Sequence, residues 1–322
     1  MITAFAREQF RQLAIGRPMA VTIGVFDGVH RGHQALIGRL VAAARERGLA
    51  SGVITLHPAP ITVIRPDVRV MYITSLEERI ELLRGLGVDA VGSLTFTSEL
   101  SLVSAADFIA AMRETLDMRL LVGGPDITIG RAREGNAQWL ATHAAEIGVE
   151  VEIVAPLMES AASKIGSSGV REAVAAGDVE AAAQLLGRPF SVRGPVIHGF
   201  ERGRTIGFPT ANIAVSADRV LPALGVYVSR AQLGETVYPS VTNIGRRPTF
   251  DDGPPSIETF ILDFDQDVYG RELKLELLHR LRGELRFDGV AALVEQIGRD
   301  AADARRWHAG QGERSRVLDP PT

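Results

Sequence analysis

Apolar runs of strand length alternate with helical stripes along the first half of the chain. Val21 to Phe26 is a β-branched apolar run, Asp27-Gly28 interrupts it, and a stripe of apolar residues at helical spacing begins after Gly32. Further strand-like runs lie at 51–56, 88–94, 119–122 and 149–154, and helical patterns lie at 75–86, 105–116, 136–147 and 173–186. This alternation predicts an α/β domain, a parallel sheet with helices on both faces.

The pattern changes after Gly187-Arg188-Pro189, where the helical character ends. Short strand patterns follow, split by glycine and proline, at 190–197, 225–231, 236–242, 256–264 and 272–278. Five or six short antiparallel strands in one stretch predict a small closed β-barrel, and an amphipathic pattern at 290–307 predicts a C-terminal helix. We therefore expect two domains, residues 1–187 and 188–322.

The length, charge and composition of the chain exclude several classes of protein function. The 322 residues are enough for two domains with proper cores, and the net charge of −4 provides no basic field to attract nucleic acid. The absence of cysteine excludes disulfides, thiolate nucleophiles and thiolate metal sites. No secretory signal pattern and no apolar run of membrane-spanning length is visible. We expect a soluble cytoplasmic protein that binds neither nucleic acid nor a membrane.

The turn after the first strand carries the first candidate chemistry. His30 and His33 lie three residues apart among glycines, at the carboxyl end of a strand, where parallel sheets bind their ligands. The free N–H groups of the next helix suit a phosphate, and two imidazoles can donate hydrogen bonds to a phosphoryl group. The spacing fits neither a P-loop nor a Gly-x-Gly-x-x-Gly fingerprint. The turn predicts a site that binds a nucleotide and acts on a phosphate; the alternative is a tight connection with two surface histidines.

Three further stretches of the first half fall at strand ends or in loops, at 56–60, 123–135 and 164–171. Ser167 or Ser168 is a candidate N-cap of a short helix, which by itself is an ordinary structural role. With Lys164 and Arg171 nearby, the same cap would also hold an anionic phosphate.

A glycine-rich loop at 199–212 carries the candidate chemistry of the second half. Gly203 and Gly207 allow backbone N–H groups to turn toward phosphate oxygens. Thr210 and Asn212 offer neutral oxygens, which suit a Mg²⁺ ion that already has phosphate ligands. The alternative is an ordinary barrel loop with a Pro-Thr turn.

Taken together, these stretches resemble the bifunctional bacterial FAD synthetase family, in which riboflavin kinase is fused to FMN adenylyltransferase. Gly24-x-Phe26-Asp27-Gly28-Val29-His30-x-Gly32-His33 is similar to the adenylyltransferase motif of the HxGH type. Gly203-x-x-x-Gly207-x-Pro209-Thr210-Ala211-Asn212 is similar to the riboflavin kinase motif, and 243–250 and 262–270 are similar to further signatures of the kinase half. The resemblance covers nearly the whole chain.

The resemblance implies a Rossmann-like nucleotidyltransferase domain followed by a six-stranded Greek-key barrel. The kinase half would bind riboflavin and MgATP and form FMN and ADP. The transferase half would join FMN to the adenylyl group of a second ATP, giving FAD and pyrophosphate. The implied ligands are therefore Mg²⁺, ATP, riboflavin, FMN and FAD, all of them small molecules.

The resemblance also implies roles for single residues. Glu258 matches the catalytic carboxylate of the kinase half, and Thr210 and Asn212 would hold Mg²⁺. His30 and His33 would stabilise the ATP phosphates in the transferase half. The remaining implied nucleotide- or flavin-binding positions are Gly24, Phe26, Asp27, Gly28, Gly32, Asp126, Ser167, Ser168, Arg171, Gly203, Gly207, Pro209 and Asn243.

The sequence departs from the family pattern at three places in the first half. Ala59 stands between two prolines where the family has histidine, Ile127 and Ile129 replace two aromatic residues, and Gly166 replaces a serine. The leading hypothesis is a bifunctional enzyme. Two alternatives stay open: a riboflavin kinase whose first domain has lost or changed its adenylyltransferase activity, and a flavin-binding regulator without turnover.

Overall fold

The structure, a computed structural model, describes residues 2–159, 164–199, 203, 206–246 and 255–318, with side chains as far as residue 310. The chain divides into two compact units, Met1–Ser167 and Ser168–Thr322.

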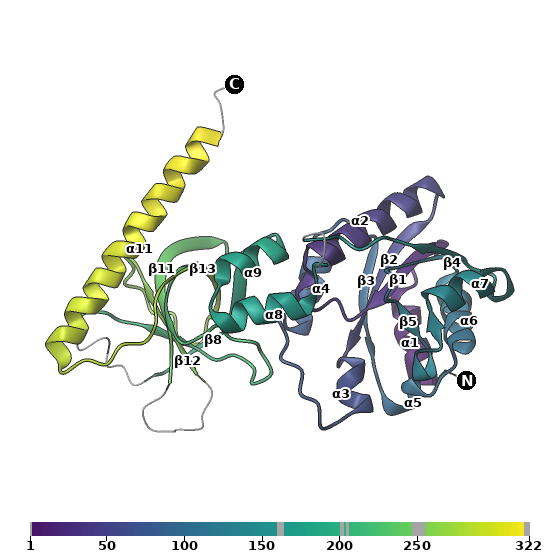
Figure 1. Ribbon diagram of the computed structural model, residues 1–322, viewed down its shortest axis with the longest axis horizontal. Helices are drawn as coiled ribbons and strands as arrows, with labels where there is room; N and C mark the ends of the chain where they lie inside the picture. Colours follow the sequence, from purple (N-terminus) through teal and green to yellow (C-terminus); the bar gives the residue numbers. More distant parts are fainter. Residues whose placement is uncertain (1, 160–163, 200–202, 204–205, 247–254, 319–322) are drawn as a thin grey trace. The chain divides into compact units, whose positions relative to one another are not determined.

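The first unit is built on a five-stranded sheet in which every neighbouring pair is parallel (Figure 1). In spatial order the strands are β3 (Ala90–Thr95), β2 (Ala50–His57), β1 (Met19–Gly24), β4 (Met118–Gly123) and β7 (Glu150–Ile153). The main helices are α1 (Ala4–Leu13), α2 (Arg31–Glu46), α4 (Leu76–Arg84), α6 (Ala105–Leu116) and α7 (Ala137–Ile147). The smaller elements are η1 (Asp27–Val29), α3 (Pro60–Ile64), α5 (Ser98–Ser101), β5 (Thr128–Ile129), η2 (Arg131–Arg133) and β6 (Gly135–Asn136). The predicted parallel sheet is confirmed.

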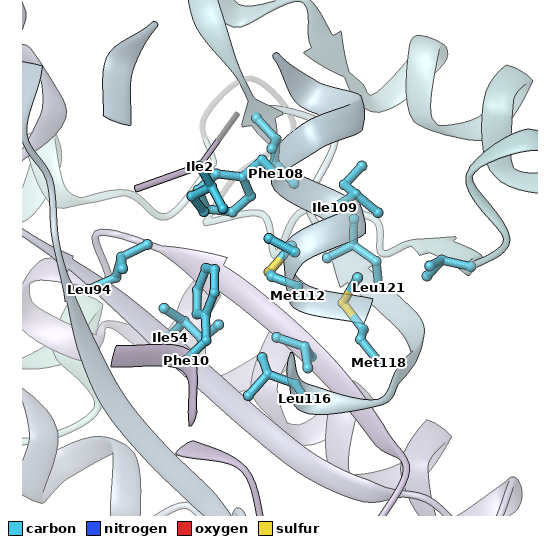
Figure 2. Packing of buried hydrophobic residues seen from close by; sticks show 14 of the residues in the cluster. Ile2, Phe10, Ile54, Leu94, Phe108, Ile109, Met112, Leu116, Met118 and Leu121 are labelled. Atoms are coloured by element: carbon cyan, nitrogen blue, oxygen red, sulfur yellow. The ribbon is translucent and has the colours of Figure 1, made fainter. Parts of the chain in front are cut away.

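Two apolar cores lie on the two faces of this sheet. On one face, Phe10 of α1 and Phe108 of α6 meet edge to face with ring centroids 5.7 Å apart (Figure 2). On the other face, Ile37 and Leu40 of α2 pack with Leu83 of α4 against the sheet. Because each face is covered by helices, the sheet can offer a ligand only the ends of its strands.

Helix α1, which the sequence pattern did not predict, covers the edge strand β3. Leu13 packs so close to β3 that a Cβ atom at Gly92 would lie 2.3 Å from its Cδ2. The Gln9 side chain accepts a hydrogen bond from the Thr95 N–H (3.1 Å) and donates one to the Thr95 hydroxyl (2.9 Å). The helix therefore satisfies part of the open edge of the sheet.

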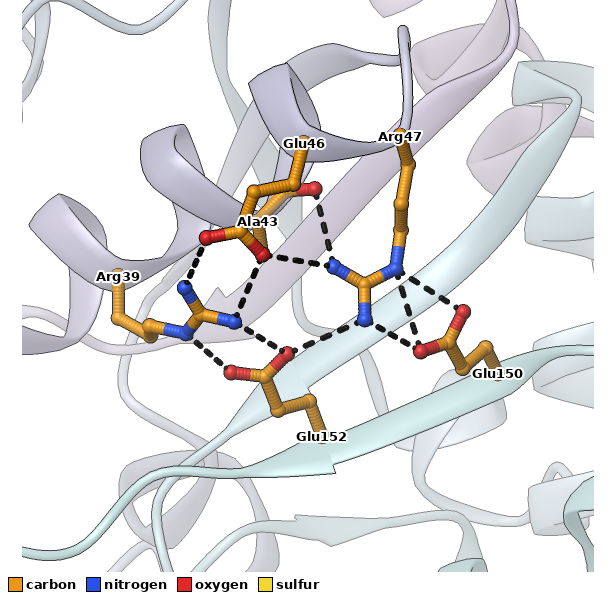
Figure 3. A network of polar contacts seen from close by, with 6 residues as sticks. All are labelled: Arg39, Ala43, Glu46, Arg47, Glu150 and Glu152. Atoms are coloured by element: carbon orange, nitrogen blue, oxygen red, sulfur yellow. Dashed lines mark hydrogen bonds and ion pairs between the residues drawn. The ribbon is translucent and has the colours of Figure 1, made fainter.

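Charged side chains join the C-terminal part of α2 to the edge strand β7 (Figure 3). Arg39 binds both carboxylate oxygens of Glu46, at 2.7 and 3.1 Å, and also contacts Glu152. Arg47 donates to the Ala43 carbonyl at 3.1 Å and binds Glu150. The paired glutamates raise the pKa of Arg39 above its usual range, and Arg39 lowers the pKa of Glu46. The network restrains the helix that begins at the His30–His33 turn.

The second unit is a closed barrel with antiparallel pairing throughout, as predicted. In spatial order its strands are β10 (Gly225–Leu233), β11 (Thr236–Gly245), β12 (Ser256–Ile261), β9 (Ala211–Ile213), β8 (Phe190–Ile197) and β13 (Glu272–Arg282). The associated helices are α8 (Ser167–Ala176), α9 (Val179–Leu186) and α11 (Val290–Leu318). The division between the units falls at the start of α8, before the predicted boundary at 187, because α9 packs on β8 and β13.

The pleat of the barrel strands separates a hydroxyl-rich interior from an outer face that α11 covers in part. Inside, Ser240, Ser229, Thr242 and Thr259 are fully buried and form a chain of hydrogen bonds of 2.8, 2.7 and 2.9 Å. Outside, Val226, Val228 and Val241 pack against Ala301 and Ala304 of α11. The buried Asp300 of the same helix receives two hydrogen bonds from the Arg282 guanidinium, at 3.0 and 2.7 Å.

In the part of the chain that the structure describes, no helix is both long enough and apolar enough to cross a membrane.

We predict that Phe10→Ala lowers the free energy of unfolding of the first unit by about 3–5 kcal/mol, the usual cost of truncating a buried phenylalanine. Phe10 is fully buried, whereas Phe5 on the same helix is 58% exposed, so Phe5→Ala is the matched control. Urea unfolding followed by Trp139 fluorescence in a Trp307→Phe background reports on the first unit alone, since the chain has two tryptophans. Equal effects of the two substitutions would contradict the prediction.

Candidate active sites

The turn between β1 and α2 is held in an unusual backbone conformation. Phe26 and Val29 have φ values of +50° and +42°, which L-residues seldom adopt, and Gly28 has a φ of +79°. A Cβ atom at Gly28 would also lie 2.9 Å from Cγ2 of Ile73. Such strain persists only where surrounding contacts determine the conformation, and it is concentrated at functional sites.

The turn brings His30 and His33 together, as the sequence predicted. His30 is the N-cap of α2: its Nδ1 accepts a hydrogen bond from the N–H of His33 at 3.3 Å. The two rings stack with centroids 3.6 Å apart and planes 21° apart, and Phe26 meets the His33 ring edge to face at 5.2 Å. The stacked imidazoles therefore lie at the N-terminus of a helix, where a phosphate is favoured.

The His33 ring is kept uncharged by its surroundings. Burial lowers the pKa of His33 well below its usual value, and the nearby His30 and Arg79 lower it further. Its Nδ1 atom is buried and has no hydrogen-bond partner in the described residues. A neutral imidazole has one N–H donor, so one ring nitrogen can donate to a phosphate oxygen without a full charge.

The other glycines of the motif leave room for close packing. A Cβ atom at Gly32 would lie 3.0 Å from the Ile165 carbonyl oxygen and 3.1 Å from the His30 ring. A Cβ atom at Gly24 would lie 3.1 Å from the tip of the Phe26 ring. These two positions thus preserve the turn; direct ligand contact at them stays a prediction.

Asp27 uses its carboxylate within the protein. The carboxylate is buried and accepts hydrogen bonds from the Ile73 N–H (3.0 Å) and the Thr74 N–H (3.2 Å). An Nη atom of the fully buried Arg79 lies 3.6 Å away. The carboxylate thus fixes the turn to the 73–74 segment, and the predicted role of Asp27 in nucleotide binding stays a prediction.

The loop at 164–167 lies against the same turn. The Ser167 hydroxyl donates to the Asp27 carbonyl oxygen at 3.0 Å, so two motifs far apart in sequence are in contact. Ser168 and Arg171 follow on α8 in the second unit, and their role toward a phosphate stays a prediction. The open space around Gly166 shows that its lack of a side chain is not required by packing.

Asp126 is an exposed residue of the loop after β4. It accepts a hydrogen bond from Lys164 Nζ at 2.8 Å, and this contact lowers the pKa of the Asp126 carboxyl. Ile127 and Ile129, which stand where the family has aromatic residues, are buried in the core of the first unit. In this chain the side chains at those two positions contribute to the packing of the first unit.

A pocket of about 360 Å³ lies in the second unit beside the riboflavin kinase motif. Pro209 and Thr210 form one wall, and the loop from Phe264 to Tyr269 forms another. The Tyr269 ring stacks on His198 with centroids 3.8 Å apart. The lining combines apolar and aromatic side chains with polar ones, among them Asp265 and Asp267.

Three predicted residues form a row across neighbouring barrel strands. Glu258 of β12 pairs directly with Asn212 of β9 on one side and with Asn243 of β11 on the other. Directly opposite residues share a face, and this face also carries Val241 and Phe260 of the core under α11. All three polar residues are half-buried on the outer face of the barrel. The row is not part of the wall of the neighbouring pocket, which Thr210 lines.

The kinase motif fits a Mg²⁺ ion that is held partly by phosphates. A Cβ atom at Gly203 would lie 3.3 Å from the Thr210 hydroxyl, and one at Gly199 would lie 2.3 Å from the Asn212 amide nitrogen. The backbones of the two glycines therefore lie close to the Thr210 and Asn212 side chains. No group of three His, Asp or Glu side chains in the described ranges could hold a metal. Gly207, with φ +85°, shapes the same loop, while 200–202, 204–205 and 247–254 lie outside the described residues.

The residue beside the histidine turn that sequence reasoning missed is Arg79, which is fully buried and lies against Asp27. Arginine at a helical position is normally exposed, so a hydrophobic pattern gives no signal for it. The capping box of Ser75 and Glu78 located the helix correctly, but not the face on which Arg79 lies.

Comparisons with known proteins agree with this arrangement. The family model described as FAD synthetase matches residues 13–169, and the model described as riboflavin kinase matches residues 186–308. A curated bifunctional riboflavin kinase/FMN adenylyltransferase of Listeria monocytogenes is 39% identical, with 90% of this chain and 92% of the relative covered. The protein of the same name from Escherichia coli K12 is 37% identical, with 89% and 92% covered.

A solved structure is similar over the same length. A crystal structure described as a macrolide-efflux protein from Streptococcus pneumoniae has a TM-score of 0.84 and 33% identity, covering 93% of this chain and 97% of that chain. The two family models lie in the order of the two units, and curated relatives span nearly the whole sequence. The chain therefore belongs to the family of bifunctional riboflavin kinase/FMN adenylyltransferases.

Proposed function

We propose that this chain phosphorylates riboflavin to FMN in its second unit and adenylylates FMN to FAD in its first unit, with ATP as the donor in both reactions. The observation that carries the proposal is that both sets of polar groups are assembled in one chain. The stacked His30 and His33 lie at a helix N-terminus, and Glu258 lies between Asn212 and Asn243.

In the kinase reaction, the terminal ribityl hydroxyl of riboflavin attacks the γ-phosphorus of ATP. Glu258 accepts the hydroxyl proton as the new O–P bond forms and the bond to the β-phosphate oxygen breaks, which releases ADP. Thr210 and Asn212 would hold Mg²⁺, which when bound neutralises charge on the phosphates. Gly203, Gly207 and Pro209 would shape the loop over the phosphates, and Asn243 would position the acceptor beside Glu258.

In the transferase reaction, a phosphate oxygen of FMN attacks the α-phosphorus of ATP, and pyrophosphate leaves. The nucleophile belongs to the substrate, so the protein needs only to align the groups and stabilise the developing charge. His30 and His33 donate hydrogen bonds to the phosphates, and Ser167, Ser168 and Arg171 would hold the departing pyrophosphate. Asp126 would lie near the nucleotide or the flavin.

A second candidate function is a riboflavin kinase whose first unit no longer makes FAD. The observation that favours it is that residues 127 and 129 are buried isoleucines, which have no aromatic ring to stack on a flavin. The intact geometry of His30 and His33 favours the bifunctional enzyme.

A product assay separates these two functions. We expect riboflavin with MgATP to give FMN and then FAD, and FMN with MgATP to give FAD and pyrophosphate, with the flavins separated by chromatography. If riboflavin gives only FMN and added FMN gives no FAD, the second candidate is correct. The same incubations with CTP in place of ATP test the choice of donor.

We predict that Glu258→Gln lowers kcat of the kinase reaction by about 10²–10⁴-fold, since the amide cannot accept the hydroxyl proton. FMN adenylyltransferase activity of the same variant should be unchanged and serves as an internal control. Glu272→Gln, at an exposed carboxylate on β13 of the same barrel, is the matched control. A Glu258→Gln enzyme with normal kinase turnover would remove Glu258 from its proposed role.

We predict that Asn212→Leu raises the Mg²⁺ concentration needed for half-maximal kinase activity by about tenfold, because a neutral oxygen ligand is lost without a change of charge. The measurement is a Mg²⁺ titration of FMN formation at fixed total ATP. Asn136→Leu, in the first unit, should leave the titration unchanged. An unaltered Mg²⁺ requirement in Asn212→Leu would contradict the proposed metal site.

A further inference from the structure

Arg79 is the largest side chain that the structure buries completely. A guanidinium group is costly to remove from water unless it is paired and hydrogen-bonded. Its Nη1 donates to the Val25 carbonyl oxygen at 2.9 Å, and its Nη2 lies 3.6 Å from Asp27 Oδ1. The Tyr72 ring lies 5.5 Å from the guanidinium carbon. A side chain held this firmly is available to fix the segments it contacts.

These contacts come from separate segments that meet behind the histidine turn. Val25 follows β1, and its carbonyl oxygen also accepts a hydrogen bond from the Thr55 hydroxyl of β2 at 2.9 Å. Tyr72 lies in the segment before α4, and its hydroxyl accepts a hydrogen bond from the Ala59 N–H at 2.8 Å. Arg79 therefore joins α4 to the carboxyl ends of β1 and β2.

The Asp27 carboxylate holds the same turn through a second set of hydrogen bonds. The carboxylate accepts hydrogen bonds from the Ile73 and Thr74 N–H groups. The Thr74 hydroxyl accepts a hydrogen bond from the Gly28 N–H at 3.1 Å. The turn contains three residues with positive φ values. Arg79 thus fixes the chain just before this turn, and the 73–74 segment fixes the turn itself. Contacts on both sides are what a strained conformation requires in order to persist.

We propose that Arg79 is a positioning residue of the adenylyltransferase site, which together with Asp27 holds the 25–29 turn and so fixes the place and charge of the His30–His33 ring pair. This inference rests on the function proposed above. Neither residue needs to touch a substrate to act in this way. Misplacement of a catalytic group by about 1 Å is enough to cost about 100-fold in rate.

Because charged groups surround His33, the proposal predicts specific changes in the pKa of His33. His30 and Arg79 both lower the pKa of His33, and burial is the largest cause. Asp27 lies against Arg79 and partly neutralises it, while Phe26 on the other side of the ring is uncharged. Removing Arg79 should therefore raise the pKa of His33, and removing the charge of Asp27 should lower it.

The first test is a titration of the His33 ring by NMR in the full chain, with its signal assigned by its loss in His33→Gln. We expect the pKa of His33 to rise in Arg79→Met and to fall in Asp27→Asn. A loosened fold would instead move the pKa toward its ordinary value, upward, in both variants. Arg84→Met, at an exposed position of the same helix, is the matched control and should leave the pKa unchanged.

The second test is activity. We expect kcat of FMN adenylylation to fall by about 10- to 100-fold in Arg79→Met, with riboflavin kinase activity unchanged as an internal control. Arg79→Lys keeps the positive charge but cannot reproduce the planar guanidinium contacts, so we expect it to keep the pKa of His33 and to lower kcat. If Arg79→Met does not fold, Arg79→Lys and Asp27→Asn carry the test.

The proposal is overturned if Arg79→Met or Arg79→Lys turns over FMN at the wild-type rate, or if the pKa of His33 moves in the same direction in Arg79→Met and Asp27→Asn. The proposed function fails separately, if the wild-type protein makes no FAD from FMN. In that event the NMR titration still decides whether Arg79 and Asp27 set the state of His33.

Discussion

The first unit depends on a parallel sheet that must be covered on both faces. Residues next to each other on β1 and β4 enter opposite cores, as Leu120 and Leu121 do, so helices must occupy both sides. Only the strand ends then remain for a ligand. Since β1 occupies the middle of the sheet, its carboxyl end is the natural place for the turn that carries His30 and His33. The position of the site is thus a consequence of burial rather than of the motif alone.

In the second unit the corresponding constraint is the pleat. Thr242 and Thr259 point into the barrel and Asn243 and Glu258 point out, so one register fixes both sets. A slip of one residue in β12 would place the Glu258 carboxylate in the closed interior and a threonine on the outer face. The chain of buried hydroxyl groups makes this slip energetically unfavourable, because fully buried hydroxyls would lose their hydrogen-bond partners. The interior network thereby keeps Asn243 and Glu258 on the outer face of the barrel.

Much of this arrangement could be predicted from the sequence, because it follows from periodicity and from motifs that lie in one segment. The parallel sheet, the barrel and the meeting of His30 with His33 are examples of this kind. What could not be predicted depends on long-range burial. Arg79 is fully buried although its residue type suggests exposure, and Asp27 uses its carboxylate inside the protein. Helix α9 belongs to the unit that contains the barrel for the same reason, since its apolar side packs on β8 and β13.

The contact between α1 and β3 has a consequence for the behaviour of the chain before it is fully folded. An uncovered edge strand presents unpaired N–H and carbonyl groups and can recruit a strand from another molecule. Here Gln9 binds the Thr95 N–H, and Gly92 leaves the space that Leu13 fills. Until α1 docks, β3 is open to pairing with a second copy during synthesis or refolding. Once docked, the first helix therefore blocks intermolecular strand pairing at β3. The absence of a side chain at Gly92 allows the helix to lie close to the sheet.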